Sequence, residues 1–303
     1  MTETYQTYGQ LIRGRFFRHK AAVISCFILV ILCGLSFMAP LIENALDIDA
    51  NTSNLFNRLK PPSSEHLFGT DELGRDVFLR LLYGGKISLS VGLITALIAA
   101  FIGTVIGLIA GFYRGWVDHV LMRLTDGIIA LPLLPLLIIL AAIDLQKLGL
   151  PDSIITSENT SLYRIIFIIA LFGWTTVARL VRAGTLNILE MGYIQSARAF
   201  GVKPWRIMLV HILPNISGPL IVATTLSIGN IILLESVLSF LGLGIQPPMA
   251  SWGNMLTNAQ DLVWEYPLLT VYPGFMIFIT VICFNFIGDG LQDALNPKNS
   301  LGR

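Results

Sequence analysis

Six stretches of mostly apolar residues, each long enough to cross a lipid bilayer, dominate this sequence. A helix of roughly 20 apolar residues spans the hydrocarbon, and a helix pairs all of its backbone polar groups within the segment. Five stretches carry no charged residue, and the fourth carries one arginine, Arg179, near its end. We therefore expect an all-α integral membrane protein with about six transmembrane helices, at Ala21–Ile42, Ile87–Tyr113, Gly127–Ile143, Ile165–Val181, Ile212–Leu234 and Tyr266–Gly288.

The composition supports a membrane protein and excludes a metal or disulfide framework. Hydrophobic residues make up 54% of the chain and charged residues 13%, whereas a soluble domain is roughly 25% charged. The first apolar stretch lacks a small-residue cleavage site, so we interpret it as a retained span. The three cysteines lie inside apolar stretches and the four histidines are scattered, so no metal site is expected.

The distribution of basic residues predicts the orientation. With six spans both termini lie on one side, and thirteen of the twenty Lys and Arg residues lie there too. Cytoplasmic segments carry an excess of these residues. We therefore expect a cytoplasmic N-terminal segment (1–20), a first helix (21–42), an outer loop (43–86), a core (87–288) containing an inner loop (183–211), and a cytoplasmic tail (289–303). The basic residues of the cytoplasmic side are Arg13, Arg15, Arg18, Lys20, Arg114, Arg123, Arg179, Arg182, Arg198, Lys203, Arg206, Lys298 and Arg303.

The inner loop has the pattern of two short helices. A helix is predicted over Leu186–Phe200, Gly201 follows it, and Pro204 stands where a second helix would begin. Glycine after the last helical turn and proline in the first turn of the next helix are typical boundaries.

Two features of the spans have both a structural and a functional interpretation. Gly103, Gly107 and Gly111 repeat at a spacing of four, which is typical of a close helix-packing seam, although chance in a glycine-rich membrane protein explains it as well. Glu235 lies near the outer end of the fifth span. It is either a functional acid of the transport pathway or gate, or an interfacial side chain in contact with water.

No nucleotide site is evident. Gly69–Asp76 (GTDELGRD) has the glycine spacing of a phosphate-binding loop but lacks the lysine and the following hydroxyl residue that hold phosphate and magnesium. If ATP drives this protein, another subunit binds the ATP.

The inner loop carries a family resemblance. Tyr193–Gly201 (YIQSARAFG), followed by His211–Asn215 (HILPN), resembles the EAA loop of ABC-importer permeases. Further segments are similar to the C-type permease subunit of dipeptide and oligopeptide importers: HLFGTDELGRD (66–76), RLLYGGKIS (80–88), SFLGLGIQPP (239–248), SWG (251–253) and FNFIGDGLQDALNP (284–297). The resemblance covers residues 16–298.

The resemblance implies a type I ABC-importer permease (MetI-like) fold and a set of partners. These are a second permease chain, two ATPase subunits that use ATP and Mg²⁺, and an extracytoplasmic substrate-binding protein. No cofactor would bind this chain and no nucleic-acid partner is expected. The family's loop commonly begins Glu-Ala-Ala, so Gln195 removes a carboxylate from the ATPase contact. The implied coupling-loop residues are Gln195, Ser196, Ala197, Arg198, Ala199, Gly201 and Pro204.

We therefore expect a non-enzymatic permease subunit that imports peptides across the inner membrane by alternating access. Nickel or another small solute is an alternative cargo. An ion-gradient-driven secondary transporter is a further alternative, but it would be expected to show paired interior acids or inverted repeats. A membrane-embedded enzyme would need clustered catalytic residues within the spans, and none is evident.

Overall fold

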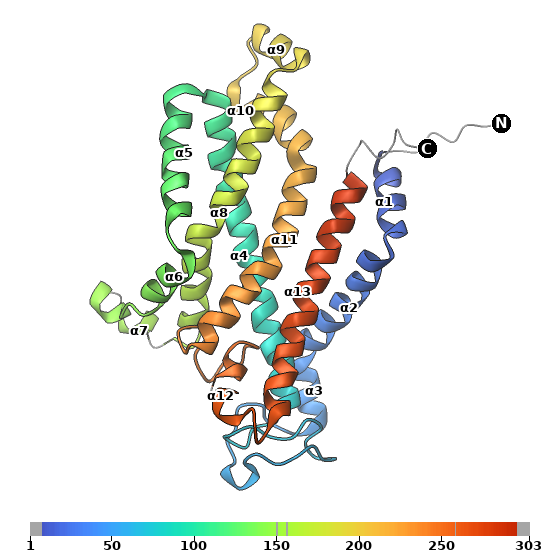
Figure 1. Cartoon of the computed structure of the whole chain (residues 1–303), viewed down its shortest axis with the longest axis vertical. Helices are drawn as coiled ribbons and strands as arrows, with labels where there is room; N and C mark the ends of the chain where they lie inside the picture. Colours follow the sequence, from blue (N-terminus) through green and yellow to red (C-terminus); the bar gives the residue numbers. More distant parts are fainter. Residues whose placement is uncertain (1–7, 150, 156, 258, 296–303) are drawn as a thin grey trace, which may run out of the picture.

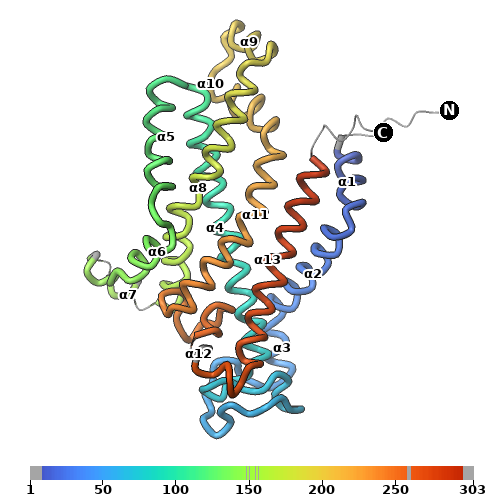
Figure 2. The backbone as a smooth tube through the Cα atoms, in the orientation of Figure 1, coloured from blue at the N-terminus to red at the C-terminus, as the bar shows by residue number. Residues whose placement is uncertain are grey.

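The computed structural model describes residues 8–149, 151–155, 157–257 and 259–295. Within these ranges the chain forms an elongated bundle of long helices (Figures 1 and 2). The expected N-terminal segment and C-terminal tail are covered only in part. Lys298 and Arg303 of the tail lie outside the described residues.

The first expected span is divided between two helices. A short helix, α1 (Tyr8–Arg18), precedes α2 (Lys20–Phe37), and α3 (Ala39–Leu46) follows after a break at Met38. Pro40 lies in the first turn of α3, where its missing N–H costs nothing because the first N–H groups of a helix have no partner within it. The predicted boundary at Ile42 was therefore wrong, and α2 alone has the length and apolarity of a span.

The next helix, α4 (Val77–Tyr113), begins ten residues before the predicted start at Ile87. Asp76 caps it, because the Asp76 carboxylate accepts a hydrogen bond of 2.8 Å from the backbone N–H of Leu79. The outer loop therefore ends at Asp76 instead of extending to residue 86, and the polar residues Arg80 and Lys86 belong to the helix.

The third expected span, Gly127–Ile143, is not one helix. The chain forms α5 (Gly115–Ala130) and α6 (Leu133–Ala141), whose axes differ by 84°. Pro132 causes the break, because it lacks an N–H and forces the preceding residue, Leu131, into an extended conformation. After a one-turn helix, α7 (Asp152–Ile155), the chain returns to the bundle.

Three further long helices complete the bundle: α8 (Thr160–Leu189), α11 (Leu213–Phe240) and α13 (Pro267–Leu295). Together with α2 and α4 they make, within the described ranges, five helices long and apolar enough to cross a membrane, and the bent pair α5–α6 would make a sixth. The expectation of an all-α chain with about six spans is confirmed. α8 extends beyond both of its predicted bounds, whereas α11 and α13 begin one residue after the predicted start and continue six or seven residues past the predicted end.

The arrangement places two different structures at the ends of the bundle. Two short helices, α9 (Gly192–Ala199) and α10 (Pro204–Arg206), project at one end, which we call the α9 end (Figure 1). At the opposite end, the α12 end, lie the outer loop and α12 (Ala259–Leu262). Along the bundle α8 packs on α4, α11 packs on both α4 and α13, and α2 packs on α13.

Candidate functional site

The loop at the α9 end has defined helix boundaries. After Phe200 the chain turns at Gly201, whose φ is +74°. The N–H of Gly201 donates to the carbonyl of Arg198 (3.0 Å), and the N–H of Val202 donates to the carbonyl of Ala197 (3.1 Å). This pair of hydrogen bonds is the Schellman closure of a helix, which favours glycine at the left-handed position. Pro204 then begins α10, as the Gly–Pro spacing predicts.

The predicted helix over Leu186–Phe200 was wrong in one respect, because it is interrupted. The helix α8 ends at Leu189, Met191 is extended, and α9 begins at Gly192. The side-chain amide of Gln195 donates to the carbonyl of Glu190 (3.2 Å), which satisfies an acceptor left open by the break.

One face of this loop is anchored in the bundle. Ile194 of α9 and Ile207, which follows α10, are fully buried and pack in a cluster with Val181 and Ile188 of α8. The guanidinium carbon of Arg198 lies 4.6 Å from the centre of the Phe112 ring at the end of α4. α9 therefore contacts α8 through this cluster and α4 through Arg198.

The opposite face of the loop carries large exposed side chains. Phe200 is 87% exposed and Trp205 is 57% exposed. Of the residues predicted for the coupling loop, Gln195, Ser196, Arg198 and Ala199 are exposed as well, and Ala197 is half-buried. Exposed aromatic groups beside basic side chains are typical of a surface that contacts another protein.

Glu235 lies in a closed polar network at the α12 end. Its side chain is fully buried. Its Oε2 accepts a hydrogen bond of 3.1 Å from Ser88 on α4, and its Oε1 accepts one of 2.7 Å from Ser239 on α11. Each serine oxygen in turn accepts a backbone N–H of the following loop, from Trp252 (3.2 Å) and Ile245 (3.0 Å) respectively. The alternative of a water-exposed interfacial carboxylate is wrong.

The glycine stripe of α4, Gly103, Gly107 and Gly111, faces α8. A Cβ atom placed on Gly103 would lie 2.6 Å from the carbonyl oxygen of Trp174, and one on Gly107 would lie 2.5 Å from that of Ala178. At Gly111 the nearest atom, the Cβ of Thr185, would be 2.7 Å away. Contacts this close leave no room for any side chain, so the two backbones approach through the glycine stripe.

Two ion pairs between α5 and α8 were missed in the sequence. Arg179 Nη2 lies 2.5 Å from Asp126 Oδ1, and Arg182 contacts Asp118 through two hydrogen bonds, one of them 2.6 Å long. The spacing of the charged residues indicated such pairs, because Arg179 and Arg182 share one face of α8, and Asp118 and Asp126 share one face of α5. The partners could not be assigned while the third span was placed at Gly127.

Among the described residues, no group of three His, Cys, Asp or Glu side chains is arranged to hold a metal ion.

Comparison with known families places the sequence among transport components. Residues 103–301 match the family described as the binding-protein-dependent transport system inner membrane component. Residues 7–62 match the N-terminal transmembrane domain of oligopeptide transport permease C.

Curated relatives align over nearly the whole chain. The dipeptide transport system permease protein of Alkalihalophilus pseudofirmus is 40% identical over 281 residues, which cover 93% of this chain and 87% of the relative. The oligopeptide transport system permease protein of Bacillus subtilis is 37% identical, with 94% and 88% covered. The glutathione transport system permease protein of Pectobacterium atrosepticum is 38% identical, with 94% and 89% covered.

Proposed function

Because this chain belongs to the family of binding-protein-dependent transport system inner membrane components, we propose that it is one permease subunit of an ATP-driven importer of short peptides. The names of the relatives support this cargo, since they include dipeptide, oligopeptide and glutathione permeases. None of these three names supports nickel, the alternative cargo. A secondary transporter is disfavoured by the family and by Glu235, whose hydrogen bonds are to serines and not to a second acid.

The observation that carries the proposal is the projecting loop at the α9 end. Its buried face joins α8 and α11, and its opposite face exposes Phe200 and Trp205. A rigid unit attached to two spans and presenting aromatic groups is suited to dock on an ATPase subunit and to move with it. Gln195 already binds a carbonyl of its own chain, so the contact would rest on shape and apolar surface more than on an ion pair.

The proposed orientation puts the α9 end in the cytoplasm. The loop carries Arg198, Lys203 and Arg206, and the positive-inside rule favours the cytoplasmic side for such a segment. The α12 end then faces outward, where a substrate-binding protein would deliver the cargo. In this orientation both chain termini are cytoplasmic.

The mechanism is alternating access without covalent chemistry in this chain. ATP binding would draw two ATPase subunits together and displace α9 and α10. That displacement would pass through the Ile194–Ile207 contact into α8 and α11 and open the path toward the α12 end. A second permease chain would complete the path. The chain itself would neither bind nor hydrolyse ATP.

Co-purification tests this assignment. The chain, expressed in its native host and isolated by an affinity tag, should bring a second permease and ATPase subunits with it. Purified alone, it should show no ATPase activity. Robust ATP hydrolysis by the isolated chain, free of other subunits, would refute the proposal.

A further inference from the structure

A pocket of about 410 Å³ opens at the α12 end of the bundle. Its walls come from segments far apart in the sequence: the outer loop, the first turns of α4, the turn after α11 and the start of α13. The volume lies within the range typical of small-molecule sites. Its polar lining includes Asp71, Glu72, Arg75, Arg80, Asn254 and Thr270.

Arg80 is the most constrained of these side chains. It lies in the first turns of α4 and is only 4% exposed. Its Nε is 3.5 Å from a carboxylate oxygen of Asp71, but its Nη1 is buried and has no hydrogen-bond partner among the described residues. A buried charged donor without a partner is costly, because the protein has removed its water and supplied nothing in return.

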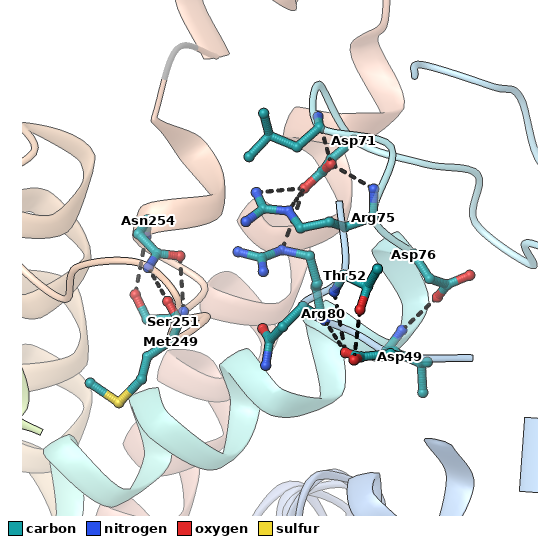
Figure 3. A network of polar contacts seen from close by, with 12 residues as sticks. Asp49, Thr52, Asp71, Arg75, Asp76, Arg80, Met249, Ser251 and Asn254 are labelled. Atoms are coloured by element: carbon teal, nitrogen blue, oxygen red, sulfur yellow. Dashed lines mark hydrogen bonds and ion pairs between the residues drawn. The ribbon is translucent and has the colours of Figure 1, made fainter. Parts of the chain in front are cut away.

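Asp71 does not neutralise Arg80 fully, because Arg75 holds the shorter contacts with the same carboxylate. Arg75 Nη2 lies 2.7 Å from Asp71 Oδ2 and its Nε lies 2.8 Å away. Figure 3 shows the two guanidinium groups one above the other, both extending toward the loop that carries Asn254. Glu72 makes no ion pair with either arginine in the part of the chain that the structure describes. Two cations therefore share one close carboxylate.

The wall of the pocket opposite Arg80 is the loop before α12, which the side chain of Asn254 holds by three hydrogen bonds. The amide nitrogen of Asn254 donates to the carbonyls of Met249 (2.8 Å) and Ile245 (3.2 Å), and its oxygen accepts the N–H of Ser251 (2.9 Å). Asn254 therefore fixes the loop across the pocket from Arg80. Thr270 adds a second unsatisfied group, since its buried hydroxyl also has no partner among the described residues.

We propose that this pocket binds the carboxylate of a peptide cargo, with Arg80 Nη1 and the Thr270 hydroxyl as donors. An unpaired guanidinium donor and an unpaired hydroxyl lining one pocket suit a ligand that offers oxygen acceptors and a negative charge. The inference rests on the proposed peptide-import function and adds a recognition site within the permease itself, separate from the binding protein.

Protection from alkylation tests the site directly. Leu73 lines the pocket and is 42% exposed, so Leu73→Cys places a reactive thiol at its rim. The purified importer complex, without binding protein, is treated with a membrane-impermeant maleimide in the presence of trialanine, N-acetyl-trialanine or trialanine amide. The parent chain reports labelling of the native cysteines, which lie in α2 and α13. Trialanine and N-acetyl-trialanine should slow the reaction of Cys at position 73, and the amide should not.

Substitutions then assign the effect to Arg80. Arg80→Gln should raise the trialanine concentration for half-protection by about tenfold or more, the typical effect of losing a charged hydrogen bond. Arg80→Lys should give an intermediate value, because lysine keeps the charge but not the planar fork. Arg58→Gln, an exposed position outside the pocket, is the matched control.

The difference in protection between trialanine and trialanine amide is measured on the Leu73→Cys chain with Arg80 intact. It therefore does not depend on how the Arg80 variants fold. Equal protection by the acid and the amide, or none by either, in a complex that imports peptide normally would overturn the site. A complex that imports no peptide would instead contradict the proposed function.

Discussion

The carboxylate of Glu235 on α11 accepts a hydrogen bond of 3.1 Å from the hydroxyl of Ser88 on α4, 147 residues away in the sequence. The same hydroxyl oxygen accepts the backbone N–H of Trp252, so one serine joins two spans and the loop after α11. Trp252 is almost fully buried, and its indole N–H donates to the carbonyl of Leu81 (2.9 Å). Glu235 therefore fixes the loop that forms one wall of the pocket at the α12 end.

Removing this carboxylate should destabilise the α12 end. Glu235→Ala leaves the hydroxyls of Ser88 and Ser239 without their acceptor in a buried site, which should cost about 1–3 kcal/mol. Glu235→Gln keeps one oxygen acceptor and should cost less. Thermal unfolding of the purified complex measures the loss of stability in both variants. Leu233→Ala, at a half-exposed apolar position on the same helix, is the control. An alanine variant as stable as the parent would show that the network does not hold the loop.

The glycine stripe should not tolerate even one methyl group. Gly107→Ala places a Cβ 2.5 Å from the carbonyl oxygen of Ala178, so α4 and α8 must separate, at a typical overpacking cost of about 1–3 kcal/mol. Gly274→Ala on α13 is the control, because nothing lies within 4 Å of its Cβ position. Membrane-protein level and melting temperature should fall for the first variant only. Equal behaviour of the two would contradict a close α4–α8 seam.

Gly201 should matter for coupling more than for insertion. Its φ of +74° disfavours any residue with a Cβ by about 1–2 kcal/mol, although a Cβ there would meet nothing within 4 Å. Gly201→Val should stay in the membrane and lose ATPase co-purification or transport. Gly192→Val, also in open space but without a positive φ, should keep more of both. Gln195→Glu, which restores the acid common in the resembled family, should be tolerated. Normal transport by Gly201→Val would remove the basis of the coupling-loop assignment.

Orientation can be measured with one cysteine. Lys203→Cys lies between α9 and α10 on an exposed position, so an impermeant thiol reagent should label it in inverted membranes and not in intact cells. A cysteine at Leu73, which lies in the outer loop and lines the pocket at the α12 end, should show the reverse pattern. Labelling of position 203 from outside intact cells would invert the proposed topology.

The sequence predicted the elements that depend on local patterns. Apolar stretches located the spans, and the spacing of Gly201 and Pro204 located the boundary between α9 and α10. The bend after Ala130 was not predicted, because proline is tolerated in many membrane helices and local sequence does not say whether the helix continues. Ser88 could not be identified as a partner of Glu235, because the contact depends on how α4 packs on α11.

The pairing of charges was missed for a similar reason. Arg179 and Arg182 contact acids on α5, a helix that begins twelve residues before the predicted start of the third span at Gly127. The pocket at the α12 end is lined by four separate segments, and no single sequence motif predicts it. Only the packed bundle brings Arg80 and Thr270 to one cavity.

Reconstituted uptake tests the central claim most directly. The complex of this chain with a second permease and ATPase subunits, inserted into liposomes and supplied with the binding protein, should accumulate a labelled dipeptide only when ATP is present on the side of the α9 end. Omitting this chain or the ATPase subunits should abolish uptake. Uptake by this chain alone, driven by an imposed ion gradient without ATP, would contradict the account.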